Sequence, residues 1–353
     1  MAAILSGGFA FAQISGPPSG GNQKSSVTQY MGLAHVTITY NSPDVTAPNG
    51  DDRTGQIWGQ LVPYGLTNLN FGLSSEENPS PWRAGANENT TISFSHDVEV
   101  EGKPLAAGTY GLHMIPGEQE WTVIFSNNSS SWGSYFYQPS EDALRVKVKP
   151  LQNEFNEWLT YEFDDRQLNQ TTASLEWENL RVPFTISVPD LNNLYMATIE
   201  DELRGSAGFS YQNYVSAANF ALSNNMDLEK AEAWANQAAN APFVGQQNYT
   251  TLSTMATVQK AQGKNEEAMK TMKMAIDHPT ANVFQIHQAG RGLIAQGENK
   301  MALQVFKWNA ERFPDTWPVN VGLARGYAAN GEYQKALKHA QMALEKAPDQ
   351  VNQ

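Results

Sequence analysis

The sequence predicts an α+β multidomain protein in which an antiparallel, jelly-roll-like β-sandwich is followed by an α-helical tetratricopeptide-like solenoid. Three observations support this prediction. Apolar residues alternate with period two in short stretches between residues 27 and 190. Beyond Pro189 the chain is rich in alanine at helical spacing. Glycines at positions 263, 297 and 331 then recur every 34 residues, which is the tetratricopeptide period.

The composition excludes several classes of function. The formal net charge is −13 and no basic stripe compensates for it, so we expect no nucleic-acid partner. The chain has no cysteine, which excludes disulfides, thiolate metal sites and cysteine nucleophiles. It also has no paired-histidine motif and no Asp-rich calcium loop, so we expect neither a metal centre nor a cofactor.

The N-terminal residues 1–12 are typical of a signal peptide. They form a short apolar run that ends in an Ala-Phe-Ala cleavage pattern, with Gln13 as the first mature residue. The positively charged start of such a signal is missing, as expected of a truncated leader; a disordered apolar leader is the alternative. Residues 13–26 are predicted to be a linker rich in Gly, Pro and Ser, and no other stretch approaches the length of a membrane span. The chain is therefore expected to be exported, to the periplasm, the cell surface or the medium.

Residues 27–190 are predicted to form the β-sandwich. The pattern is clearest in the two strands near its end, where Val146 and Val148 alternate with charged residues and Leu159 alternates with polar ones. Turn-forming sequences such as EGKP and SNNSSS separate the strands. The strands are predicted at residues 35–40, 56–62, 90–95, 109–116, 121–125, 144–150, 158–163, 173–177 and 182–188.

Residues 191–209 are predicted to be a connector, and residues 210–350 a tetratricopeptide-like repeat domain. Small residues allow paired helices to approach closely, an aromatic side chain wedges between them, and a proline ends the second helix. The middle repeat carries Gly290, Ala302, Phe306 and Pro314 at the corresponding positions. An earlier, degenerate helical pair at 210–242 is expected to cap the stack.

The first domain resembles a family of exported bacterial β-sandwich domains of unknown function, some of which carry tetratricopeptide repeats behind the sandwich. The resemblance covers roughly residues 27–188 and implies fold and export but no reaction. This chain departs from the family pattern at residues 66–81, a long insertion beside the Pro-Tyr-Gly segment. The resemblance rests on the W-R-x-G-A-N-E motif within residues 82–117 and on the segments 56–65, 121–126, 132–137 and 142–150.

The segment that carries this motif is the first candidate site. Arg83 offers a planar fork for a carboxylate or phosphate, and Trp82 offers a stacking surface. Glu88 is a candidate general acid or base, or a metal ligand. The structural alternative is a latch, in which Arg83 pairs with Glu88, Asn87 binds the backbone and Trp82 packs beneath the loop.

His113 is the second candidate catalytic residue. If the strands around 91–95 and 109–115 pair, His113 approaches Glu88, and a neutral imidazole beside a carboxylate is an acid/base pair. The alternative is a strand histidine that faces solvent.

The helical repeats offer a third candidate site. Four residues fall at positions that commonly face the concave side of such a solenoid, namely Lys260, His287, Arg291 and Arg325. Arg291 and Arg325 are 34 residues apart and so occupy equivalent positions on adjacent repeats. A basic groove suits an acidic peptide or a free C-terminal carboxylate. The alternative is ordinary solvated charge, paired with Glu298 or Asp315.

Together these patterns favour an exported, non-enzymatic binding or scaffold protein. A protein or peptide partner would dock in the helical-repeat groove, with the β-sandwich as a partner module. The alternative is a hydrolase or a carbohydrate-binding sandwich that acts on envelope or extracellular glycans through the Trp82–Glu88 loop. In the hydrolase, Glu88 and His113 would be the acid/base candidates. Self-assembly through the two unlike halves is a further hypothesis.

Overall fold

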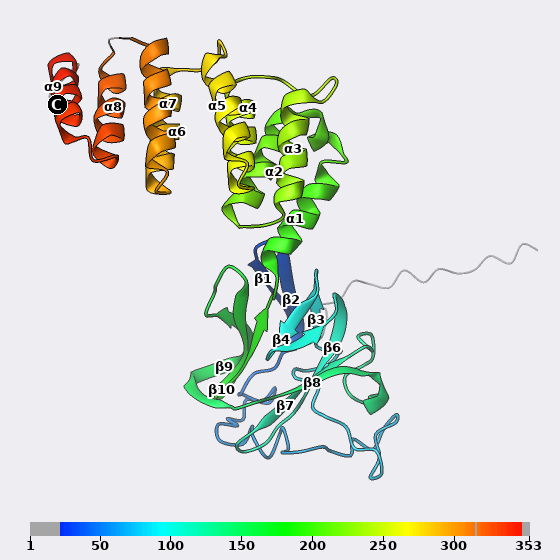
Figure 1. Cartoon of the computed structure of the whole chain (residues 1–353). Helices are drawn as coiled ribbons and strands as arrows, with labels where there is room; N and C mark the ends of the chain where they lie inside the picture. The colour runs from blue at the N-terminus through cyan, green and yellow to red at the C-terminus, as the bar shows by residue number, and fades with distance from the viewer. Residues whose placement is uncertain (1–21, 315, 348–353) are drawn as a thin grey trace, which may run out of the picture. The chain divides into compact units, whose positions relative to one another are not determined.

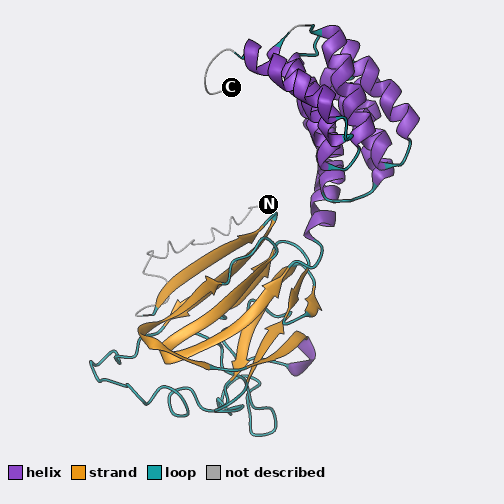
Figure 2. Ribbon diagram, turned by 60° about the vertical axis from the view of Figure 1, so that its left-hand side comes forward, coloured by secondary structure: helices purple, strands orange, loops and turns teal. Residues whose placement is uncertain are grey.

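The computed structural model describes residues 22–314 and 316–347. The chain divides into two compact units between Leu191 and Asn192. The first unit contains strands, one short 3-10 turn at Pro139–Glu141 and a long stretch of loops and turns over residues 43–90, and helices make up most of the second unit (Figure 2). The prediction of antiparallel strands followed by helices is confirmed. The predicted signal peptide and most of the predicted linker lie outside the described residues.

The first unit contains two antiparallel sheets (Figure 1). One sheet has six strands in the order β1-β2-β3-β6-β7-β8. Its strands are β1 (Gln23–Met31), β2 (Ala34–Ser42), β3 (Thr91–Phe94), β6 (Gly108–Ile115), β7 (Trp121–Ser126) and β8 (Asp142–Val148). The other has four strands in the order β5-β4-β10-β9. Its strands are β5 (Lys103–Leu105), β4 (Val98–Val100), β10 (Gln170–Ser187) and β9 (Leu151–Asp164).

Large apolar side chains from the two sheets meet in one core. The ring of Phe125 on β7 lies 6.1 Å from that of Phe184 on β10, and Tyr40 on β2 lies 4.9 Å from Tyr161 on β9. The alternation that predicted these strands is present, because Val146 and Val148 are buried while Lys147 between them is exposed. Burial of such side chains contributes about 1.5–3 kcal/mol each and is the main stabilising term of this unit.

The strand predictions differ from the structure in several places, and the short strands β4 and β5 were not predicted. β1 begins at Gln23, inside the predicted linker, and its mostly polar residues at the sheet edge give no apolar alternation. Residues 56–62 form turns, because Gly59 adopts a left-handed φ of +82° in the middle of that segment. The predicted strands 173–177 and 182–188 are one strand, β10, in which register shifts around Glu178 produce a bulge.

The second unit consists of helical hairpins. The hairpins α4–α5, α6–α7 and α8–α9 follow the 34-residue period, and α2 and α3 form the earlier pair. Asparagine side chains at positions 248 and 282 form capping boxes that start α4 and α6. In the described residues the helices are α1 (Leu191–Glu202), α2 (Tyr211–Ser223), α3 (Leu228–Asn240), α4 (Tyr249–Ala261), α5 (Asn265–Asp277), α6 (Val283–Ala295), α7 (Asn299–Arg312), α8 (Trp317–Ala329) and α9 (Tyr333–Lys346). None of them has both the length and the hydropathy needed to cross a membrane.

The periodic glycines and the aromatic wedge have the roles that the repeat pattern predicts. Gly263, Gly297 and Gly331 take left-handed φ values of +79°, +78° and +79° at the turns inside the three hairpins. Phe306 on α7 is fully buried, and glycines of α6 and α8 contact its ring.

Candidate functional site

Two neighbouring helices bring three of the predicted groove residues together. α6 carries His287 and Arg291, α8 carries Arg325, and the two helices contact each other. A Cβ added to Gly322 of α8 would lie 3.2 Å from His287 Nδ1, so α8 approaches the imidazole closely. We call these three residues the α6–α8 basic site.

The two arginines of this site lack an acidic partner among the described residues; Asp315, one partner expected from the sequence, lies outside them. Both are exposed, and no carboxylate among the described residues forms an ion pair with either. Arg291 Nη1 donates to the side-chain oxygen of Gln288 at 3.5 Å. Burial lowers the pKa of His287, and the charges of Arg325 and Arg291 lower it further, while the Pro318 carbonyl acts in the opposite direction. His287 is therefore neutral at neutral pH, and the site carries the charge of its two guanidinium groups.

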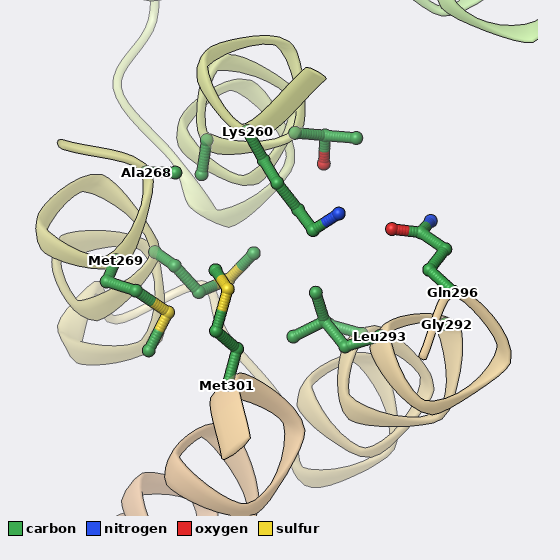
Figure 3. Close-up of a pocket in the computed structure, with 11 residues that line it drawn as sticks. Lys260, Ala268, Met269, Gly292, Leu293, Gln296 and Met301 are labelled. Carbon is green, nitrogen blue, oxygen red and sulfur yellow. The ribbon is translucent and has the colours of Figure 1, made fainter. Parts of the chain in front are cut away.

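Lys260 does not belong to this site. Its Nζ lies 3.3 Å from Glu298 Oε1, which is the pairing with Glu298 that the alternative interpretation expects. Its side chain is only 18% exposed and points into a cavity of about 170 Å³ between α4, α5, α6 and α7 (Figure 3). Met269, Leu293 and Met301 supply most of the apolar wall, and Gln296 faces Lys260 across it.

The Trp82–Glu88 loop begins as an addition to β6. The backbone of Trp82 exchanges two hydrogen bonds with that of Met114, at 2.8 and 2.9 Å. The Trp82 ring stacks on Trp177 at 6.4 Å and meets Trp58 and Trp121 edge-on at 5.8 and 6.3 Å. Trp82 therefore packs into a cluster of four tryptophans, as the latch interpretation expects of it, and is not an exposed stacking platform.

Arg83 departs from the latch interpretation. Its Nη1 donates to the Asn87 carbonyl at 2.5 Å, and its guanidinium lies 4.9 Å from the centre of the Tyr135 ring. No described carboxylate pairs with it, so the predicted Arg83–Glu88 pair is wrong. Asn41 Nδ2 donates to Glu88 Oε2 at 2.7 Å.

The loop holds two non-glycine residues in the left-handed region. Ala84 and Asn87 have φ values of +52° and +55°. The carbonyl of Ala84 accepts hydrogen bonds from Thr90 Oγ1 at 3.1 Å and Tyr161 Oη at 2.9 Å, which fix the loop in this conformation. Such conformations persist only where the surrounding structure enforces them.

His113 is buried rather than facing solvent. It is 2% exposed, and its Nδ1 lies 2.9 Å from Ser134 Oγ. No described carboxylate forms a hydrogen bond or ion pair with it, so the expected pairing with Glu88 is absent from its contacts. Burial lowers the pKa of His113 to about 4, and the positive charge of Arg83 contributes to this shift.

A cavity of about 120 Å³ lies beside this loop, and the sequence patterns did not reveal it. It collects residues from the 61–69 segment, from the start of the Trp82–Glu88 loop and from Ser134. Ser80 and Ser134 line it and were missed, because short-range patterns cannot show a contact made across the fold. The only sequence signal for this cavity was the position of the 66–81 insertion next to Trp82.

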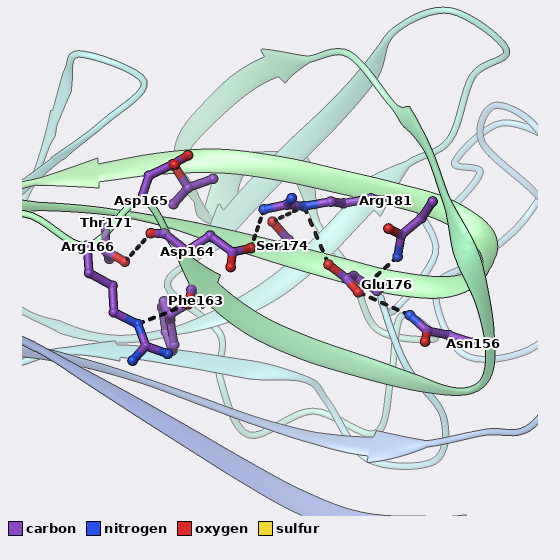
Figure 4. A network of polar contacts seen from close by, with 11 residues as sticks. Asn156, Phe163, Asp164, Asp165, Arg166, Thr171, Ser174, Glu176 and Arg181 are labelled. Carbon is purple, nitrogen blue, oxygen red and sulfur yellow. Dashed lines mark hydrogen bonds and ion pairs between the residues drawn. The ribbon is translucent and has the colours of Figure 1, made fainter.

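A network of charged and polar side chains lies on β9 and β10 (Figure 4). Arg181 bonds to Asp164, and its Nε lies 2.8 Å from Ser174 Oγ and 3.4 Å from Glu176 Oε1. The other oxygen of Glu176 accepts from the side-chain amides of Asn153 and Asn156 at 2.9 and 3.0 Å. The carboxylates and the guanidinium satisfy one another, so this network stabilises the long β9–β10 hairpin. Across residues 22–314 and 316–347, no cluster of three His, Asp or Glu side chains is arranged to hold a metal ion.

Comparison with known proteins finds one family model that matches part of this chain, within the first unit. Residues 22–186 match a protein of unknown function (DUF2911). This segment is just under half of the chain, and the family description names no reaction. The W-R-A-G-A-N-E segment lies within the matched residues. A search of curated proteins gives no match.

Among solved structures, the similarities concern less than half of this chain. The crystal structure of MamA is 13% identical, with 46% of this chain and 92% of that chain covered and a TM-score of 0.32. YrrB, described as a TPR protein with an unusual peptide-binding site, is 20% identical, with 46% and 86% covered and a TM-score of 0.29. The C-terminal part of a TPR repeat-containing protein from Cytophaga hutchinsonii is 20% identical, with 44% and 61% covered and a TM-score of 0.32. At these scores the similarities carry no argument about function, and the repeat assignment rests on the 34-residue period of the helices.

Proposed function

We propose that this protein is a non-enzymatic docking protein that binds an acidic peptide segment at the α6–α8 basic site. The supporting observation is that Arg291 and Arg325 are exposed, equivalent in the repeat and without a carboxylate partner among the described residues. A guanidinium group presents a rigid fork of donors that matches a carboxylate, and exposed unpaired forks on adjacent helices suit two acidic side chains. The neutral His287 between them adds an apolar and hydrogen-bonding surface without repelling a cationic neighbour of the peptide.

The spacing of the helices sets the expected spacing of the acidic residues. Packed helices lie about 8–10 Å apart, axis to axis. An extended peptide advances about 3.3 Å per residue, so two acidic residues three positions apart match that separation. The preferred ligand is therefore an extended segment with the pattern acidic-x-x-acidic.

Fluorescence anisotropy tests this proposal. Three labelled eight-residue peptides are titrated with the full chain: one with two glutamates three positions apart, one with the glutamates adjacent, and one with glutamines in place of both. The first peptide should bind most tightly, and the glutamine peptide should bind at least tenfold more weakly. Equal affinity for all three peptides would contradict the proposal.

The hydrolase or carbohydrate-binding alternative has weaker support. A general base works best when its pKa lies near the working pH, whereas the pKa of His113 falls to about 4. Trp82, the expected sugar platform, packs against three other tryptophans, whereas the exposed aromatic side chains of this region include Trp132 and Phe136. Turnover of a glycan that is lost in Glu88→Gln would favour the hydrolase over the docking protein.

Export remains part of the proposal and rests on residues 1–12 alone. When the full chain is produced in a bacterium, intact-mass measurement of the exported protein should give a mature N-terminus at Gln13. Recovery of an uncleaved chain from the cytoplasm would contradict it. We also infer that the two sheets of the first unit form a β-sandwich, supported by the ring contacts between β7 and β10 and between β2 and β9.

A further inference from the structure

The cavity beside Trp82 is a candidate site for a small molecule, independent of the proposed docking role because it lies within the first unit. We call it the Arg83 cavity. Its volume is about 120 Å³, and one of its lining residues, Leu61, is 47% exposed, so that end is accessible from solvent. Its lining includes Leu61, Leu69, Ser80, Pro81, Arg83 and Ser134.

Arg83 gives this cavity its charge. The guanidinium is half-buried, and its hydrogen bond to the Asn87 carbonyl uses only one of its five N–H donors. No described carboxylate neutralises it, and no acidic side chain lines the cavity. A half-buried charge without a partner is costly, and a bound anion would remove that cost.

Gly133 and Tyr135 hold the guanidinium in place. A Cβ at Gly133 would lie 2.3 Å from Arg83 Cζ, so only glycine lets the guanidinium lie against the backbone there. The ring of Tyr135 covers it at 4.9 Å. The fork is therefore positioned before a ligand arrives, which reduces the entropy lost on binding.

Two hydroxyl groups add polar contacts at the same cavity. Ser80 is 2% exposed, and its Oγ has no hydrogen-bond partner. Ser134 Oγ contacts His113, which is neutral at neutral pH and so does not supply a second cation. An unpaired buried hydroxyl is uncommon and gains a partner when a polar ligand binds.

Size and the remaining walls define the ligand. A protein cavity of about 150 Å³ holds a molecule the size of benzene, so this one accommodates about six non-hydrogen atoms or fewer. Leu61, Leu69 and Pro81 give it apolar surface, which would leave much of a phosphate or sulfate unsolvated. We propose that the Arg83 cavity binds a short monocarboxylate, such as propionate or butyrate, with its carboxylate on Arg83 and its alkyl chain among these apolar residues.

Isothermal titration calorimetry on the full chain tests this site at constant ionic strength. Acetate, propionate, butyrate, octanoate and inorganic phosphate are compared. Affinity should rise from acetate to butyrate, because each added methylene buries apolar surface, and should fall for octanoate, which exceeds the cavity. Phosphate should bind at least tenfold more weakly than butyrate. The proposal would be overturned if none of the carboxylates bound at concentrations of 100-fold the protein concentration and above. It would also be overturned if phosphate bound with the same affinity as butyrate.

Variants locate the binding. Arg83→Gln should weaken butyrate binding at least tenfold, and Ser80→Ala about threefold. Lys24→Gln, which removes a positive charge from the exposed part of β1, should leave the affinity unchanged. Arg83→Lys keeps the positive charge but loses the planar guanidinium fork, so this variant should bind butyrate with intermediate affinity. It replaces Arg83→Gln as the test if Arg83→Gln does not fold. Wild-type affinity in both Arg83 variants would place any binding elsewhere and overturn the proposal.

Discussion

Gly290 of α6 faces the ring of Phe306 of α7 so closely that a Cβ at Gly290 would lie 2.4 Å from Phe306 Cε1. The ring cannot move away, because it is fully buried and equally close to Gly322 and Gly326 of α8. The Phe306 ring therefore joins the hairpin α6–α7 to the first helix of the next hairpin, α8, and it supports the relative placement of α6 and α8 on which the docking proposal depends.

Gly290→Ala should therefore destabilise the helical unit. Forcing an extra methyl into a filled core costs about 1–3 kcal/mol of unfolding free energy. Urea denaturation followed by circular dichroism at 222 nm reports this unit, since it holds the α-helices. The matched control is Gly292→Ala on the same helix, where no atom lies within 4 Å of the added Cβ. That change should stabilise by up to about 1 kcal/mol through helix propensity, and a loss of stability equal to that of Gly290→Ala would contradict the account.

Gly133→Ala should destabilise the first unit more than a glycine substitution in an ordinary turn. Both Gly133 and Gly102 have left-handed φ values, +59° and +71°, so an alanine at either costs about 1–2 kcal/mol in backbone strain. Only at Gly133 does the added Cβ also meet Arg83, at 2.3 Å, whereas nothing lies within 4 Å at Gly102. Six of the nine tryptophans belong to the first unit, so urea denaturation followed by tryptophan fluorescence is the measurement. Equal losses in the two variants would show that the Arg83 contact has no energetic role.

The first unit should lose stability between pH 6.5 and pH 4 through His113. The pKa of this imidazole is lowered from 6.5 to about 4 in the folded chain, so below pH 6.5 the unfolded chain binds more protons than the folded one. The free energy of unfolding therefore falls by about 3 kcal/mol in total as the pH decreases from 6.5 to 4. Above pH 6.5, His113 does not affect it. Denaturation of the wild type and of His113→Asn at a series of pH values measures the effect. The variant should show a flatter dependence; the same slope in both proteins would exclude His113 as the cause.

Lys260→Met should leave the helical unit as stable as the wild type, or slightly more stable. The ammonium group is largely buried and pairs with Glu298, and such a pair gains little over an apolar side chain that fills the same space. The cavity around it is lined by Met269, Leu293 and Met301, and methionine adapts to such irregular apolar surroundings. The free energy of unfolding, obtained from urea denaturation followed by circular dichroism at 222 nm, should change by less than about 1 kcal/mol. A loss of about 3 kcal/mol or more would show that the ion pair is structurally required.

Local pattern accounts for much of the fold. The alternation around Val146 and Leu159 predicted buried strand faces, and the glycines at 263, 297 and 331 predicted the three hairpin turns. β1 was missed because an edge strand needs no apolar face, and residues 56–62 were misassigned because a left-handed glycine at position 59 interrupts an otherwise strand-like segment.

The candidate sites were less predictable, since they depend on contacts between distant residues. Arg291 and Arg325 could be paired from the repeat period alone. The burial of His113 depends on Ser134 and Tyr137, which arrive from a loop more than 20 residues away, and no periodic signal marks them. The partner of Arg83 was predicted to be Glu88 from charge complementarity, whereas the guanidinium binds a backbone carbonyl and an aromatic ring instead.

The most direct test of the docking proposal uses the peptide with two glutamates three positions apart. Its affinity for the full chain is measured by fluorescence anisotropy, in the wild type and in the double variant Arg291→Ala, Arg325→Ala. Loss of two exposed charge contacts should weaken binding by about tenfold. The double variant Lys270→Ala, Lys300→Ala, which removes the same charge from exposed positions on α5 and α7, should bind as the wild type does. Equal weakening in both double variants, or none in the arginine variant, would contradict the account.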